Sequence, residues 1–155
     1  MTQPIVFIPA RRGAGRLPGK PLALIGGEPM IVHVLRRAQE ADIGPVIVAT
    51  DAPEIAAAVD KAKGRAVLTR PDHASGSDRL FEALGKADPD RRAKFIVNLQ
   101  GDLPTLDPKA VAAALKPLAD TAVDIATLAA EIRVEDERNN PNVVKSCGCG
   151  SSFQV

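Results

Sequence analysis

The chain has no tryptophan and no tyrosine, and only four of its 155 residues are phenylalanine. Aromatic side chains are the platforms on which single-stranded nucleic-acid binders stack bases. Twenty Lys and Arg residues are balanced by 19 Asp and Glu, so the formal net charge is only +1. This balance excludes a general electrostatic attraction to nucleic acid or to an anionic membrane, and any anion site must be local. We therefore expect no nucleic-acid partner.

Cysteines and long apolar runs are also scarce. Cys147 and Cys149 lie too close together for a comfortable disulfide, and they supply only half of a tetrahedral zinc shell. No apolar run approaches the length of a membrane span, and the N-terminus reverses the order of a secretory signal because its apolar stretch precedes its basic residues. We expect one globular body, without membrane insertion, in the cytoplasm.

The sequence does contain a regular alternation of β-branched apolar runs and amphipathic stretches. Strands are expected at residues 5–8, 46–50, 66–69, 95–99 and 125–132. Two helices are expected at residues 29–41 and from about 55 to 64. A third helix is marked by the apolar stripe Leu80, Ala83, Leu84 and Ala87, and a fourth by Val111, Ala114, Leu115 and Leu118. This order predicts right-handed crossovers and a largely parallel sheet with helices on both faces. Ligands bind such sheets beyond the C-terminal ends of the strands, in the loops after Ile8, Thr50, Thr69 and Leu99.

The loop after the first strand is rich in glycine and basic residues. Glycine lets the backbone approach an anion closely, and the exposed N–H groups can then bind it. The spacing matches neither a Walker A loop nor the GxGxxG dinucleotide fingerprint. The loop is a candidate triphosphate cradle, and a solvated basic loop is the alternative. Its basic residues are Arg11, Arg12, Arg16 and Lys20.

Asp102 follows the strand at residues 95–99, within the segment Asn-Leu-Gln-Gly-Asp. A carboxylate at that edge of a sheet can hold Mg2+ against phosphate oxygens, because magnesium keeps most of its waters and takes only one or two protein carboxylates. The alternative is that Asp102 initiates the turn before Pro104, which is a common role for aspartate.

Residues 73–79 lie between a strand and a helix and read HASGSDR. Ser75 or Ser77 is expected to cap the helix, with Asp78 favourable in its first turn. Arg79 is harder to explain, because the helix dipole disfavours a cation there unless a negative group is close. His33, on the first helix, is expected to be packed or at an edge, and no Ser-His-Asp triad is found.

The last ten residues, SCGCGSSFQV, have no apolar pattern. We expect residues 1–145 to form the globular domain and residues 146–155 to be an unstructured tail or the product of an altered reading frame. A Cys-x-Cys metal clip is the alternative.

Six segments follow the pattern of a known family, in order and at the expected intervals. They read IPARRGAGRLPGKPL, PMIVHVLRRAQ, VATD, TRPDHASGSDRL, IVNLQGDLP and NPNVVK. Over about residues 4–145 the chain resembles the 3-deoxy-manno-octulosonate cytidylyltransferases, also called CMP-Kdo synthetases. The resemblance implies an α/β fold with a Rossmann-like nucleotidyltransferase sheet, incomplete at the C-terminus. It also implies transfer of CMP from CTP to the acidic sugar Kdo, for lipopolysaccharide biosynthesis.

The same resemblance implies a role for each residue of the site and a homodimer as the family's assembly. Arg11, Lys20 and Asp102 would be catalytic, with Asp102 bound to Mg2+. The nucleotide would be held by Ala10, Arg11, Arg16, Lys20, Ser75, Arg79 and Gln100, and Gln100 would also face the sugar.

Two departures from the family pattern leave alternatives open. Leu103 stands where the family often has Glu, and the chain ends before the family's sugar-binding residues, its second metal carboxylate and much of its dimer interface. The chain is therefore a working subunit, a catalytically inactive CTP-binding fragment or interaction partner, or a cytidylyltransferase for another acidic sugar. We expect no turnover by the chain alone unless another chain supplies the missing groups.

Overall fold

The computed structural model describes residues 3–13, 18–129, 133, 135–138 and 153–154. The chain divides into two compact units, residues 1–108 and 109–155. The first unit contains every described residue that the sequence analysis assigns to the site. The boundary between the units falls inside the predicted domain of residues 1–145.

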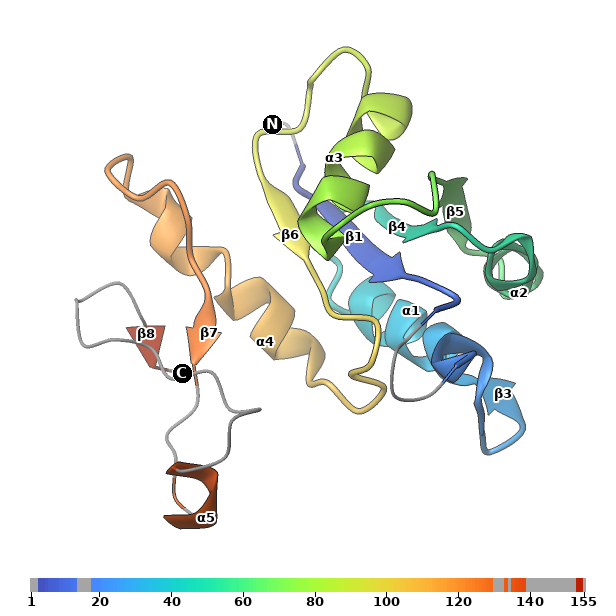
Figure 1. Ribbon diagram of the computed structural model, residues 1–155. Coiled ribbons are helices and arrows are strands. Elements are labelled where there is room, and N and C mark those ends of the chain that lie inside the picture. The colour runs from blue at the N-terminus through green and yellow to red at the C-terminus, as the bar shows by residue number, and fades with distance from the viewer. Residues whose placement is uncertain (1–2, 14–17, 130–132, 134, 139–152, 155) are drawn as a thin grey trace. The chain divides into compact units, whose positions relative to one another are not determined.

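A four-stranded parallel sheet organises the first unit (Figure 1). Its strands lie in the order β5 (Arg65–Leu68), β4 (Val46–Thr50), β1 (Ile5–Ala10) and β6 (Ile96–Asn98). In the centre, Phe7 pairs with Ile47 on one side and with Asn98 on the other. The predicted parallel sheet is confirmed, and all four of its strands were expected within about two residues of their bounds.

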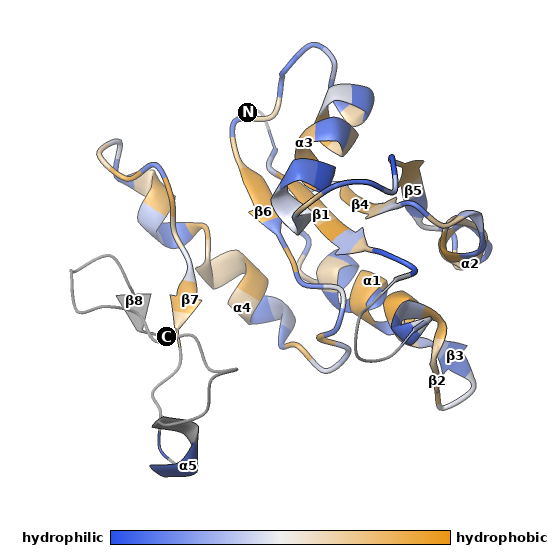
Figure 2. Ribbon diagram, viewed as in Figure 1, coloured by the Kyte–Doolittle hydropathy of each residue, from blue (hydrophilic) through white to orange (hydrophobic). Residues whose placement is uncertain are grey.

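Helices cover both faces of this sheet, as predicted, because successive residues of a strand point to opposite faces. Val6, Ile8 and Val48 pack with the buried side chains of α1 (Met30–Glu40) and α2 (Pro53–Lys61). Phe7 and Ile47 point the other way and pack against α3 (Gly76–Ala87). Figure 2 shows β1 and β4 as largely hydrophobic, whereas the residues that directly follow β1 are hydrophilic.

A short hairpin after the 3-10 turn η1 (Lys20–Leu22) was not predicted. Strands β2 (Leu24–Ile25) and β3 (Glu28–Pro29) are antiparallel, and Gly26 and Gly27, both with positive φ, form the turn between them. Two-residue strands are too short to produce a periodic pattern, although a Gly-Gly pair is a recognised turn signal. His33 Nε2 lies 2.8 Å from the carbonyl oxygen of Ile25, so this histidine holds the hairpin to α1, in the packed role expected for it.

The second unit departs from the predicted elements. The expected helix through Leu118 is divided into α4 (Pro108–Ala113) and the 3-10 turn η2 (Lys116–Ala119), because Pro117 has no N–H to continue the helix and restricts the residue before it. Within the predicted strand at 125–132, residues 130–132 lie outside the described residues, and β7 (Leu128–Ala129) is the strand that the structure describes. Helix α5 (Glu135–Arg138) was not predicted.

Strand β8 (Phe153–Gln154) pairs with β7 in parallel and belongs to the segment predicted as an unstructured tail. Residues 146–152 and 155, with Cys147 and Cys149, lie outside the described residues, so the tail and the metal clip stay predictions. Over the described chain, none of the helices has the length and apolar character that crossing a membrane requires.

Gly44, just before β4, allows a close approach between two backbone segments. A Cβ atom at this position would lie 2.0 Å from the carbonyl oxygen of Pro4, and the φ angle is +156°. We expect Gly44→Ala to lower the free energy of unfolding by about 2 kcal/mol or more, because backbone atoms cannot move aside as a flexible side chain can. Urea unfolding followed by circular dichroism measures this.

Gly85→Ala is the matched control for Gly44→Ala. Gly85 lies within α3, and a Cβ atom there would meet nothing within 4 Å. Because alanine favours a helix over glycine by about 1 kcal/mol, this variant should be slightly more stable than the wild type. Equal stabilities of the two variants would contradict the close approach at Pro4.

Candidate functional site

A pocket of about 250 Å³ lies at the C-terminal edge of the parallel sheet. Its walls come from the end of β1, from the loop before α3 and from the loop after β6. Five residues that the sequence analysis assigned to the site line it together: Ala10, Arg11, Ser75, Arg79 and Gln100. Pro9, His73, Ala74 and Gly76 complete the lining. The pocket therefore forms where the rule for parallel sheets predicted it, although the role of each residue stays a prediction.

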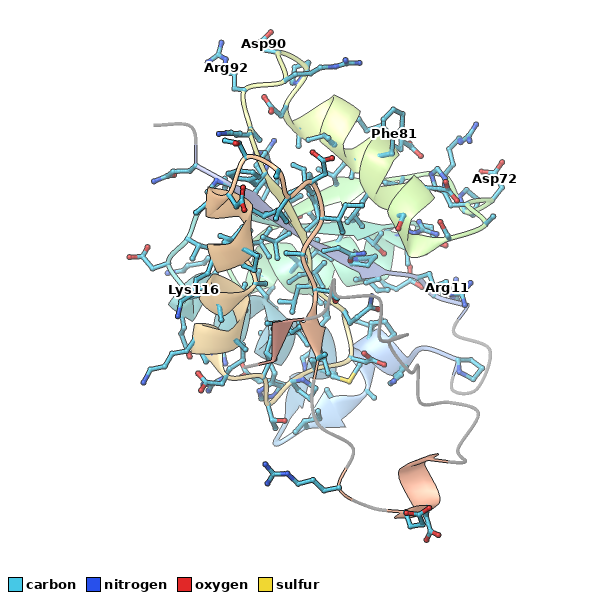
Figure 3. All side chains as sticks on the ribbon, turned by 90° about the vertical axis from the view of Figure 1, so that its left-hand side faces the viewer. Arg11, Asp72, Phe81, Asp90, Arg92 and Lys116 are labelled. Atoms are coloured by element: carbon cyan, nitrogen blue, oxygen red, sulfur yellow. The ribbon has the colours of Figure 1, made fainter. Side chains whose placement is uncertain are left out.

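The basic loop after β1 is fixed at its base through the peptide groups of Arg12. The N–H of Arg12 donates to Asp51 Oδ1 at 3.1 Å, and its carbonyl accepts from the N–H of Gly19 at 3.2 Å. The Arg12 side chain pairs with Glu54 at 3.2 Å on the exposed start of α2. Arg11, the first residue after β1, is exposed (Figure 3). Residues 14–17, with Arg16, lie outside the described residues.

Lys20 and Asp102 form an ion pair in which Nζ lies 2.8 Å from Oδ2. The two side chains are 38% and 48% exposed. The structure thus brings together a residue predicted to bind phosphate and a residue predicted to bind metal. Gly101, which precedes Asp102, packs against β1 so closely that a Cβ atom would lie 2.8 Å from the carbonyl oxygen of Pro9. The chain after β6 is therefore held against the end of β1.

Arg79 is buried, with 3% of its surface exposed, and both terminal nitrogens of its guanidinium make polar contacts. Nη1 donates to the hydroxyl of Thr69 at 2.6 Å and to the carbonyl of Arg70 at 3.1 Å. Nη2 lies 3.4 Å from Asp51 Oδ2. Asp51 is the negative group that a cation in the first turn of α3 requires, and the sequence analysis missed it. Its position directly after a buried strand was the available signal.

Ser75 caps α3, as expected for Ser75 or Ser77. Its hydroxyl accepts from the N–H of Asp78 at 3.1 Å, while the Asp78 carboxylate accepts from the N–H of Ser75 at 3.1 Å. This reciprocal capping box satisfies two backbone donors at the start of the helix. The pocket wall at Ser75 is therefore a defined helix end.

Glu82 holds the loop before α3 in place, and sequence reasoning missed this residue. Its carboxylate accepts from Lys86 Nζ at 2.6 Å, from the N–H of Arg70 at 3.1 Å and from His73 Nε2, which lies 2.5 Å away. These hydrogen bonds, that of Lys86 first, lower the pKa of Glu82 to about 2. The ionised carboxylate therefore fixes His73 and the neighbouring pocket wall.

Groups of three or more Asp, Glu, His or Cys that could bind a metal are absent from the described part of the chain. A metal ion at the pocket would therefore be held by one or two protein carboxylates together with oxygen atoms of a bound ligand. Asp102, two residues after the pocket residue Gln100, has a half-exposed carboxylate.

Known proteins match nearly the whole chain. The model of the cytidylyltransferase family matches residues 5–147. A 3-deoxy-manno-octulosonate cytidylyltransferase of Methylobacterium nodulans is 65% identical over 148 residues, which cover 96% of this chain and 60% of the relative. One of Rhodopseudomonas palustris is 64% identical over 150 residues, covering 96% and 61%. The chain thus spans about 60% of the length of the curated relatives it matches.

Solved structures agree with the fold. The structure of a CMP:2-keto-3-deoxy-manno-octonic acid synthetase complexed with CTP has a TM-score of 0.76 and 45% identity, covering 82% of this chain and 52% of that one. A cytidylyltransferase from Leptospira borgpetersenii has a TM-score of 0.59 at 23% identity, covering 76% and 49%, which shows the fold alone. The Rossmann-like nucleotidyltransferase sheet expected from the sequence is confirmed.

The lowered pKa of Glu82 predicts how acid affects stability. The carboxyl has a pKa of about 2 in the folded chain and near 4.5 when unfolded. Its contribution to stability is therefore complete above pH 4.5 and is lost as the pH falls through 2. We expect Glu82→Gln to show a shallower fall in unfolding temperature between pH 5 and pH 2 than the wild type. Parallel curves would contradict the proposed hydrogen bonding.

Proposed function

Because the chain belongs to the cytidylyltransferase family, we propose that it binds CTP and supplies the nucleotide site for transfer of CMP to 3-deoxy-manno-octulosonate. Pyrophosphate is the second product, and the step serves lipopolysaccharide biosynthesis. The observation that carries this proposal is the single pocket that unites Ala10, Arg11, Ser75, Arg79 and Gln100. The solved relative complexed with CTP supports the nucleotide, and the names of the curated relatives support the sugar.

In the proposed complex, the nucleotide would lie between two walls of the site. On the side of β1, Arg11 and Lys20 would contact the phosphates, together with Arg16 of the same loop. On the side of α3, Ser75 and Arg79 would hold the cytidine against Ala10. Gln100, from the loop after β6, would face both the nucleotide and the sugar. A basic wall for the phosphates, and a wall for the base whose cation, Arg79, is paired with Asp51, fit the two ends of CTP.

Asp102 is the residue that would hold Mg2+. Its carboxylate is half exposed, pairs with the cationic group of Lys20, and belongs to the residue two positions after the pocket residue Gln100. One carboxylate fits magnesium, which completes its shell with waters and phosphate oxygens. When bound, the ion supplies charge neutralisation at the phosphates. Lys20, which pairs with Asp102, would neutralise charge on the same phosphate group.

The reaction joins the anomeric oxygen of the sugar to the α-phosphorus of CTP. The bond between that phosphorus and the pyrophosphate oxygen breaks, and the proton of the sugar hydroxyl is released. Such transfers depend on positioning and charge neutralisation rather than on a covalent intermediate with the protein. Arg11 and Lys20 would supply the charge, and Gln100 would orient the sugar.

Pyrophosphate release from CTP, Mg2+ and Kdo, measured beside a calorimetric titration of CTP alone, tests the proposal. Binding with release supports the complete function. Binding without release limits this chain to the nucleotide site, and the absence of CTP binding would overturn the proposal.

Asp102→Asn should weaken CTP binding in the presence of Mg2+ by about tenfold, or about 1.4 kcal/mol. The reason is that the amide lacks the charge that magnesium prefers, so most of the gain in affinity from magnesium should disappear. Calorimetric titrations with Mg2+ and with EDTA measure that gain.

Asp90→Asn is the control for Asp102→Asn. Asp90 pairs with Arg92 in an exposed turn beyond the C-terminal end of α3, away from the pocket residue Arg11 (Figure 3). This variant should keep the full response to magnesium. An equal response in Asp102→Asn would remove Asp102 from the metal-binding role.

A further inference from the structure

Asp51 contacts both walls of the pocket. It directly follows β4, its side chain is 12% exposed, and its two carboxylate oxygens accept from different loops. Oδ1 accepts from the N–H of Arg12, in the loop after β1, and Oδ2 lies 3.4 Å from Nη2 of Arg79, on α3. We infer that Asp51 is a positioning residue. It sets the spacing between the phosphate wall, which contains Arg11 and Lys20, and the base wall, which contains Ser75 and Arg79. This inference rests on the proposed function, because the two walls matter as a pair only if one ligand spans them.

The link to the phosphate wall acts at the base of the loop. Arg12 is the residue through which that loop closes, because its carbonyl accepts from the N–H of Gly19. The hydrogen bond from Asp51 holds the other side of the same residue, at 3.1 Å. The carboxylate therefore fixes the point from which Arg11 on one side and Lys20 on the other extend.

The link to the base wall acts through a buried charge. Arg79 is 3% exposed and lines the pocket, so its guanidinium cannot turn to water if Asp51 is lost. Thr69 and the Arg70 carbonyl accept hydrogen bonds from Arg79, but neither carries a charge. An unpaired buried cation is costly. Asp51 is therefore the charged partner among the three residues that hold the Arg79 side chain.

The backbone of Asp51 is itself fixed, which makes it a suitable reference point. Thr50 is fully buried, its carbonyl accepts from the N–H of Thr69 at 2.8 Å, and its hydroxyl accepts from the N–H of Ala52 at 3.2 Å. Side chains held on a rigid strand end preorganise a site, so that less ordering is needed when the ligand binds.

Asp51→Asn removes the charge of the side chain and one of its two links together. An asparagine side chain has one acceptor oxygen and one donor group. Whichever way its amide turns, it can accept from Arg12 or from Arg79, but not from both. We expect CTP to bind about tenfold more weakly, since small misplacements of positioned groups have effects of this size or larger. Hydrogen exchange of the free chain should become faster at Arg12 or in the segment that carries Arg79, according to which link the amide loses.

Asp51→Glu and Glu54→Gln complete the set. Glutamate keeps both oxygens and the charge, so the fold is retained, but it moves the carboxylate outward by one methylene and should weaken CTP binding about threefold or more. Glu54 also contacts Arg12, but through exposed side chains. We expect Glu54→Gln to bind CTP within about twofold of the wild type, because exposed pairs contribute little.

The outcomes separate this inference from the proposed function. If the wild type binds CTP and folded Asp51→Asn binds it equally well, the inference is overturned. If Asp51→Asn does not fold, the glutamate variant decides, and unchanged affinity there overturns the inference. If the wild type does not bind CTP, the proposed function fails, while hydrogen exchange still decides whether Asp51 links the loops. Faster exchange in either segment supports the link, and unchanged exchange in both segments overturns it.

Discussion

The parallel pairing of β1 with β4 is the constraint on which the pocket depends. The register joins Val6 to Val46 at one end and Ala10 to Thr50 at the other. Both strands are buried on two faces, so a slip by one residue would turn every core side chain of β1 to the wrong face. The same register makes the next residues, Arg11 and Asp51, leave the sheet side by side. The contact between Asp51 and the Arg12 amide is thus a consequence of core packing.

Charge at the edge of the sheet is organised in pairs. Arg12 pairs with Glu54, Lys20 with Asp102, and Arg79 with Asp51. The first two pairs are exposed and contribute little to stability. The third is buried, where removal of one partner leaves the other charge uncompensated. Acids near this edge of the sheet thus balance three of its cations, in line with the near-neutral net charge of the chain.

The strands and most helices could be predicted because each depends on a local apolar pattern. Strand β4 was expected at residues 46–50, which are its observed bounds. The same patterns placed Ser75, Arg79 and Gln100 at one edge of the sheet, where they line one pocket. Asp51 and Glu82 could not be found in this way, because their roles depend on partners distant in the sequence, up to 39 residues away. An isolated aspartate after a strand resembles a turn residue until its partners are known.

Helix α3 shows why the core was easier to predict than the site. Its apolar residues at 80, 83, 84 and 87 form the stripe that packs on the sheet. Ser75, Asp78, Arg79 and Glu82 repeat at the same helical spacing on a second stripe, and their contacts cap the helix and hold the loop at residues 69–73. Periodicity reveals the first stripe because burial selects apolar residues, whereas the second is made of ordinary polar residues. Substitutions on the polar stripe should therefore alter the pocket while the sheet-facing core contacts remain.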